Sequence, residues 1–452
     1  MARTTIRLGT ASPGTRGSTA ETLAHTEKLA GHAAANDVDI LLLPEAYIGG
    51  YPRGTNFGCV IGGRSQEGRE EYLRYFQSAV DLGDTVGDGA GAGQAWINRE
   101  LPTDAVPGAG DERQAPNRRG DGTREELERI ARESGVFLVV GVIERAGGSL
   151  YCSVVYVCPK LGVIGKRRKV MPTGTERLVW AQGSPATLRA VSTIIRGVRI
   201  NLAAAICWEN YMPLVRQALY AQNINLYLAP TADGRDTWLP LLRTAAIEGR
   251  CFVMSSNMCV RSSSSSSRHP AAAAAPPTDG QTHSVQPEDV SADEDEELPD
   301  SDPLAARTAT GRRSSCVTEE GFEIALPKSP RGHPRRRQSV FDDDGNEIVL
   351  CGGSRVAHKP TTTTATVVPA TTGTTVTTKT EFVSRGGSAI VSPYGDVLAG
   401  PQWEDDERII YADVDFQDCI RGRLDLDTAG SYSRNDSFKF SVEGLDLSPL
   451  PY

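Results

Sequence analysis

The chain has 452 residues, 39% of them hydrophobic, and a formal net charge of −9. A mildly acidic chain does not favour nucleic acid or an anionic membrane as a partner. The nine cysteines form no Cys-x-x-Cys pair and no zinc-type spacing, which suits free thiols in a reducing compartment. No apolar signal segment opens the sequence and no run is long enough to span a bilayer, so we expect a cytoplasmic protein.

The first part of the chain alternates predicted strands and helices, which is typical of an α/β fold. Thr5–Ala11 alternates apolar and polar residues as a strand does, and Ser18 predicts the cap of a helix that runs to about Asn36. Asp39–Pro44 is a continuous apolar run, typical of a strand covered on both faces. This strand places Glu45 at its end.

The next segment breaks this pattern and then resumes it. Residues 83–122 are rich in Gly, Asp and Pro and show little periodicity, which predicts a flexible surface insertion. Thr123 to Glu126 reads Thr-Arg-Glu-Glu, a capping box for a helix over 124–134. Val136–Ile143 and Tyr151–Cys158 are predicted to be neighbouring strands.

A short apolar run in the middle of the chain ends at a cysteine. Asn201–Ile206 is predicted to be a buried strand, Cys207 follows it, and Leu214–Tyr220 has helical spacing. A strand that ends in this way is where an α/β fold can expose a nucleophile. A single cysteine is more often a buried core residue, so this pattern alone does not decide the role of Cys207.

The remaining elements complete one domain around a long insertion. We expect strands at 225–229, 251–255 and 408–414, helices at 237–249 and 416–425, and a hairpin that turns at Tyr394–Asp396. Residues 261–381 contain serine, alanine and threonine runs and charged blocks, and they lack the apolar content that offsets ordering entropy. The sequence therefore predicts one domain of residues 1–260 and 382–452, interrupted by a disordered insertion at 261–381.

The insertion contains a duplicated motif. Arg312–Leu326 aligns with Arg336–Leu350 at an offset of 24 residues, and each copy has Arg-Arg-x-Ser, an acidic patch, a glycine and Glu-Ile-x-Leu. Ser315 and Ser339 would suit a basophilic protein kinase, whose product phosphate could pair with the adjacent arginines. The Glu-Ile-x-Leu end could instead add a strand to an exposed sheet edge. A neutral duplication in a tolerant loop is an equally acceptable explanation.

Three strand ends supply an acid, an amine and a thiol: Glu45, Lys169 and Cys207. A thiol is mostly protonated at neutral pH, so a base must accept its proton before it attacks. His25 and His32 lie on the first predicted helix and the other histidines lie in the insertion, which leaves a carboxylate as the expected base. A nearby lysine would stabilise negative charge that develops during the reaction. Taken alone, each part is weak evidence.

Taken together, these segments resemble the nitrilase branch of the carbon–nitrogen hydrolase superfamily. The family's catalytic Glu, Lys and Cys match Glu45 in LLLPEAYIGGYPRG, Lys169 in GKRRKVMPTGTERLVW and Cys207 in AAICWENYMPL. A second glutamate that positions groups in relatives falls on Glu176. TADGRDTW at 231–238 and IEGRCF at 247–252 are also similar to nitrilases.

The resemblance implies a four-layer αββα sandwich that pairs into homodimers and grows into larger homo-oligomers. It implies hydrolysis of a small nitrile through a cysteine thioimidate and thioester, with no metal or other cofactor. Trp208 and Tyr51 are expected to line the substrate pocket. Gly430-Ser431-Tyr432 departs from the Gly-His-Tyr of many nitrilases, which implies a difference in the pocket or in the subunit contacts.

Two alternative functions stay open at this point. A nitrile or cyanide hydratase would release an amide from the same intermediate. A regulatory or interaction protein on a nitrilase scaffold would act through the duplicated motif instead.

Overall fold

The structure is a computed structural model that describes residues 5–86, 93–97, 120–262 and 382–452, together with four short strands between 315 and 349. The chain divides into two compact units. Unit 1 consists of Met1–Ser266 and Thr377–Tyr452, and unit 2 consists of Ser267–Val376. All the elements described below belong to unit 1, except for the four short strands.

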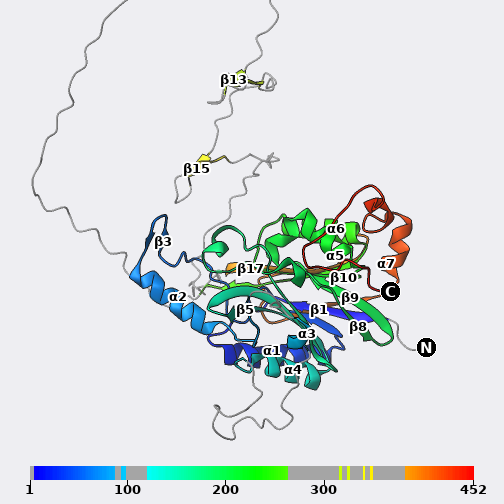
Figure 1. Cartoon of the computed structure of the whole chain (residues 1–452), viewed down its shortest axis with the longest axis horizontal. Helices are drawn as coiled ribbons and strands as arrows, with labels where there is room; N and C mark the ends of the chain where they lie inside the picture. The colour runs from blue at the N-terminus through cyan, green and yellow to red at the C-terminus, as the bar shows by residue number, and fades with distance from the viewer. Residues whose placement is uncertain are drawn as a thin grey trace, which may run out of the picture. The chain divides into compact units, whose positions relative to one another are not determined.

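Two mixed sheets form the centre of unit 1 (Figure 1). The described strands of the first sheet are, in spatial order, β19 (Ile409–Val414), β1 (Ile6–Ala11), β2 (Ile40–Leu42), β5 (Phe137–Ala146), β6 (Ser149–Cys158) and β7 (Gly162–Arg168). Strands β1, β2 and β5 are parallel, with Leu8 beside Ile40 and Ile40 beside Phe137, and the other pairs in this sheet are antiparallel.

The second sheet follows the same plan. Its described strands are, in spatial order, β12 (Cys259–Arg261), β17 (Phe382–Val391), β11 (Phe252–Asn257), β10 (Leu226–Thr231), β9 (Val198–Ala204) and β8 (Val191–Ile195), with β18 (Val397–Trp403) also paired to β17. Strands β9, β10 and β11 are parallel. In both sheets the parallel strands therefore lie at the centre.

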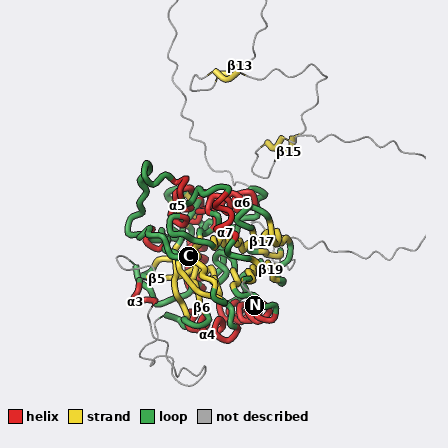
Figure 2. Tube along the Cα trace, turned by 90° about the vertical axis from the view of Figure 1, so that its right-hand side faces the viewer, coloured by secondary structure: helices red, strands yellow, loops and turns green. Residues whose placement is uncertain are grey.

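Helices cover the outer face of each sheet, which makes four layers (Figure 2). The covering helices are α1 (Thr19–Ala35) and α4 (Thr123–Ser134) on the first sheet, and α5 (Pro213–Tyr220) and α6 (Trp238–Gly249) on the second. The other described α-helices are α2 (Gln66–Ser78), α3 (Gln94–Ile97) and α7 (Asp418–Arg421), and a small hairpin joins β3 (Cys59–Val60) to β4 (Gly63–Arg64). The predicted αββα sandwich is confirmed.

The alternation of side chains along each strand produces this layering. In β2, Ile40 and Leu42 belong to the core between the sheets, whereas Leu41 belongs to the core beneath α1 and α4. In β10, Leu228 faces the core between the sheets and Tyr227 faces α5 and α6. Because both faces are buried, the central strands are continuous apolar runs.

Two local predictions differ from the structure. The sequence predicts that Thr123 caps the helix over 124–134, but helix α4 begins at Thr123 itself and its N-cap is Gly122. The Thr123 N–H donates to Asp121 Oδ1 at 3.0 Å. Residues 93–97 lie within the predicted surface insertion, yet Trp96 is buried and its indole N–H donates to the Leu82 carbonyl at 2.8 Å.

The described strands of unit 2 form two hairpins, one in each copy of the duplicated motif. β13 (Ser315–Val317) pairs with β14 (Glu323–Ala325), and β15 (Ser339–Phe341) pairs with β16 (Glu347–Val349). The register is the same in both, because Ser315 opposes Ala325 and Ser339 opposes Val349. In each copy the Glu-Ile segment thus pairs within its own motif. The Arg-Arg pairs and the rest of 263–381 lie outside the described residues.

Among the described residues, no helix combines the length and the apolar character that crossing a bilayer requires.

Candidate active site

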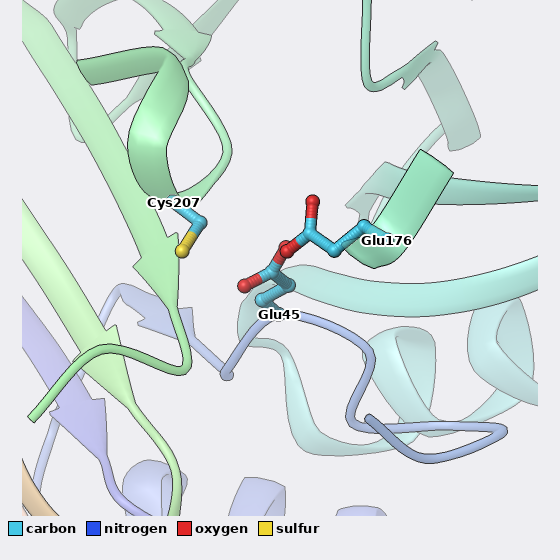
Figure 3. A group of neighbouring side chains, drawn as sticks. All are labelled: Glu45, Glu176 and Cys207. Carbon is cyan, nitrogen blue, oxygen red and sulfur yellow. The ribbon is translucent and has the colours of Figure 1, made fainter. Parts of the chain in front are cut away.

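The ends of strands from both sheets meet at one buried cluster of ionisable side chains. Glu45 follows β2, Lys169 follows β7 and Cys207 follows β9. Ligand atoms of Glu45, Glu176 and Cys207 all lie within 4.8 Å of one another, and Figure 3 shows these three side chains pointing toward each other. The structure therefore brings together the acid, the amine, the thiol and the second glutamate that the sequence indicates.

Glu45 is fully buried in a turn that begins after two residues that follow β2. Gly141 of β5 permits this turn, because a Cβ there would lie 2.1 Å from the Pro44 carbonyl oxygen. Burial raises the pKa of Glu45; the Lys169 ammonium opposes this rise and the Glu176 carboxylate adds to it. A glutamate with a raised pKa is a suitable general base.

Lys169 forms ion pairs with both glutamates. Its Nζ donates to Glu45 Oε1 and to Glu176 Oε2, both at 2.8 Å, and lies 5.5 Å from the centre of the Trp180 ring. Burial alone would lower the pKa of Lys169, but attraction to Glu45 and the nearby Glu176 carboxylate raises it well above the ordinary value. Lys169 therefore carries a positive charge beside the thiol.

Cys207 is the first residue of a short 3₁₀ helix, Cys207–Tyr211, and has a φ of +53°. This left-handed conformation is uncommon for a residue other than glycine and is a feature of functional turns. The Thr231 hydroxyl donates to its Sγ at 3.2 Å. Burial and the nearby Glu45 raise the pKa of the Cys207 thiol, so the resting residue is a thiol and not a thiolate.

Glu176 belongs to the 3₁₀ helix Gly174–Leu178 and is held by three donors besides Lys169. The Tyr51 hydroxyl donates to its Oε1 at 2.8 Å, and the Thr173 N–H and hydroxyl donate to its Oε2 at 2.7 and 3.3 Å. Tyr51 thus contacts the site through a carboxylate. Trp208 is partly buried beside Cys207, and its indole N–H donates to Asp233 Oδ2 at 3.1 Å.

Two residues of the site were not predicted. The Cys152 thiol of β6 lies 3.6 Å from Glu45 Oε1 and donates to it. Glu209 contacts the backbone on both sides of the site, at Ile206 and Val170. The sequence signal for Glu209 is its place in the Cys-Trp-Glu-Asn run, whereas nothing in the sequence relates Cys152 to Glu45.

His25, on helix α1, is not part of this cluster. His25 contacts Tyr47 and Arg16, and burial together with the Arg16 charge lowers its pKa to about 4. Ser315 and Ser339 belong to unit 2. Within the described residues, Glu45, Glu176 and Cys207 are the group with donor atoms suited to a metal ion, but the Lys169 ammonium already forms an ion pair with each of the two carboxylates.

Comparison with known proteins is consistent with this geometry. The sequence profile of the carbon–nitrogen hydrolase family matches residues 5–285 and 358–423. An arylacetonitrilase of Trametes versicolor is 31% identical over 93% of this chain and 91% of its own length. An aliphatic nitrilase of Sinorhizobium fredii is 32% identical over 93% of this chain and 90% of its own length. A bifunctional nitrilase/nitrile hydratase of Lupinus angustifolius is 31% identical over 96% of this chain and 84% of its own length.

Proposed function

Because the chain belongs to the carbon–nitrogen hydrolase family, we propose that it is a nitrilase that converts an organic nitrile and water into a carboxylic acid and ammonia. The observation that carries this proposal is the contact of Lys169 with Glu45 beside the Cys207 thiol. The relatives that are named as nitrilases support the choice of a nitrile over an amide as the substrate.

The first half of the reaction forms a thioimidate. Glu45 accepts the proton of the Cys207 thiol while the sulfur attacks the nitrile carbon, and the proton passes to the nitrile nitrogen. Coupling the two events suits the site, because burial raises the pKa of the thiol and a free thiolate would be unfavourable before attack. The positive charge on Lys169 stabilises the negative charge that develops near the former nitrile group.

The second half consumes two water molecules. Glu45 removes a proton from the first water, which adds to the thioimidate carbon and gives a tetrahedral intermediate. Loss of ammonia leaves a thioester on Cys207, and a second water activated in the same way releases the acid and restores the thiol. Glu176 holds the Lys169 ammonium in place through its 2.8 Å contact.

Release of an amide is the second product that this route allows. If sulfur leaves the tetrahedral intermediate before ammonia does, the product is an amide and the enzyme acts as a nitrile hydratase. A relative named as a bifunctional nitrilase/nitrile hydratase makes this branch worth measuring.

A panel of aromatic and aliphatic nitriles tests the proposal, with ammonia, acid and amide all quantified. The purified chain is expected to release ammonia and acid from at least one nitrile, and the Cys207→Ala variant is expected to release neither. Turnover of amides with no attack on any nitrile would reject the nitrilase assignment, and an amide product alone would move it to the hydratase branch.

Assembly and modification are separate proposals. We expect a homodimer or a larger homo-oligomer, which light scattering on the purified chain would measure. The Arg-Arg-x-Ser sequence before Ser315 and before Ser339 supports phosphorylation of both serines by a basophilic kinase. Phosphopeptide mapping of protein from its natural source tests this, and unmodified serines at both positions would contradict it. The cytoplasmic location stays a prediction.

A further inference from the structure

Glu209 lies two residues after Cys207 and is fully buried, but it has no place in the reaction described above. Its Oε2 accepts a hydrogen bond from the Ile206 N–H at 2.8 Å, directly before the nucleophile. Its Oε1 accepts from the Val170 N–H at 2.6 Å, directly after the lysine. One carboxylate therefore joins the backbone neighbours of both Cys207 and Lys169.

Arg167 extends this connection from one sheet to the other. Its Nη2 donates to Glu209 Oε1 and its Nη1 donates to the Ala204 carbonyl, both at 2.7 Å. Arg167 belongs to β7 of the first sheet, whereas Ala204 is the last residue of β9 in the second. The ion pair thus bridges the two strand ends that supply the amine and the thiol.

The backbone at Cys207 needs such support because its φ is +53°. Asn210 holds the far side of the turn, since its Nδ2 donates to the Cys207 and Ala205 carbonyls at 2.6 and 2.9 Å. Glu209 holds the near side at Ile206. Without the carboxylate, the turn would lose its hydrogen bond to Val170, the residue that follows Lys169.

We propose that Glu209 is a positioning residue that sets the separation between the Cys207 sulfur and the Lys169–Glu45 pair. Its negative charge is required, because a guanidinium and the N–H groups of Ile206 and Val170 converge on its two oxygens. A glutamine has one acceptor oxygen, and its amide N–H₂ would face one of these donors. The proposal builds on the proposed function for turnover, but the placement of the sulfur is measurable without turnover.

The test compares Glu209→Gln with Glu128→Gln. Glu128 is the matched control, because it is also buried, pairs with Arg124 at 3.2 Å and accepts the Val163 N–H at 2.9 Å. It lies in α4 on the outer face of the first sheet, away from the site. Two reactions are measured on the full chain. The first is turnover of a nitrile, which gives kcat and KM. The second is alkylation of Cys207 by iodoacetamide, whose rate is followed by peptide mass spectrometry.

For Glu209→Gln we expect kcat to fall roughly 10- to 100-fold with KM little changed, because a small displacement of reacting groups has effects of this size. Alkylation of Cys207 should slow in parallel. Glu128→Gln should lower Tm but leave both rates, corrected for folded protein, at the wild-type value. If Glu209→Gln does not fold, Glu209→Asp keeps the charge beside Arg167 but is too short to reach both N–H groups, and should show the same loss of both rates.

A variant at position 209 that folds and retains both rates would overturn the proposal, and so would an equal loss of both rates in Glu128→Gln. If the wild-type chain hydrolyses no nitrile, the proposed function fails, while the alkylation rates still decide the role of Glu209.

Discussion

Lys169 controls the charge balance of the site, because it is the shared partner of two buried carboxylates, Glu45 and Glu176. In a buried environment an ion pair is not strongly stabilising compared with apolar residues, but removal of one partner is costly, since it leaves a buried charge uncompensated. We therefore expect the lysine to contribute to both folding and the proposed catalysis.

Replacement Lys169→Met tests this balance. We expect the free energy of unfolding to fall by about 3–5 kcal/mol and kcat to fall by about 10²–10³-fold through loss of charge stabilisation. Urea denaturation and steady-state kinetics measure the two effects. The control is Arg385→Met, which breaks an exposed pair with Glu404 and should change stability by only about 0–1 kcal/mol. A Lys169→Met variant with wild-type stability would contradict the account.

The pH dependence of turnover reports on Glu45. As the base, Glu45 must be deprotonated, so kcat/KM should fall as the pH drops through its pKa in the folded protein. Burial raises that pKa above the ordinary value of 4.5, so the midpoint of the acid limb should lie above 4.5. A pH profile of kcat/KM measures this midpoint. A limb at or below the ordinary value would indicate that Glu45 is not the base.

At the scale of elements, local sequence signals located the site and non-local contacts completed it. The apolar run before Glu45 and the one before Cys207 each predict a buried strand with a polar residue at its end, and this is what β2 and β9 show. The contact from Cys152 to Glu45 depends on the register of β6 against β5, which no local pattern reveals. The bridge made by Glu209 depends on how the two sheets face each other.

Strand β8 was also missed, for a reason of turn chemistry. It pairs with β9 through the two-residue loop Arg196–Gly197, and both residues have positive φ. The usual signal for such a turn is Asn-Gly or Asp-Gly, because these residues tolerate the left-handed region. Because the first loop residue is an arginine, the turn residues do not predict this hairpin.

Replacement Gly141→Ala tests how β5 positions the base. The new Cβ would lie 2.1 Å from the Pro44 carbonyl oxygen and 2.8 Å from Glu45 Cα, so either β5 or the Glu45 turn must move. We expect a loss of about 1–3 kcal/mol in the free energy of unfolding, together with a lower kcat. Thermal denaturation and kinetics measure both.

The matched control for this change is Gly31→Ala in α1, where a Cβ meets nothing within 4 Å. It should stabilise the protein by about 0.4–1 kcal/mol and leave kcat unchanged. If Gly141→Ala behaves like Gly31→Ala, the close approach of β5 does not position Glu45.

At the scale of the molecule, the proposed chemistry belongs to unit 1. All the residues assigned to the reaction lie in Met1–Ser266, whereas the duplicated motif lies in unit 2. The division differs slightly from the predicted insertion, because Arg261 belongs to β12 and pairs with Phe382 of β17. The insertion therefore begins after a strand that the second sheet needs.

Deletion of residues 267–376, replaced by a short Gly/Ser linker, tests whether unit 2 contributes to turnover. We expect kcat and KM for the nitrile to be unchanged, because the site and both sheets are retained and loop length has a small effect on stability. Circular dichroism and Tm would establish that the shortened chain is folded. A folded deletion variant without turnover would show that unit 2 completes the site.

The central claim is that Cys207 forms a covalent intermediate with the substrate carbon, with Glu45 as base and Lys169 as the stabilising charge. The most direct test is acid quenching during turnover of a nitrile, followed by peptide mass spectrometry. We predict a thioimidate or acyl adduct on the peptide that contains Cys207, and none in Cys207→Ala. Turnover without an adduct on Cys207, or with the adduct on another cysteine such as Cys152, would contradict the account.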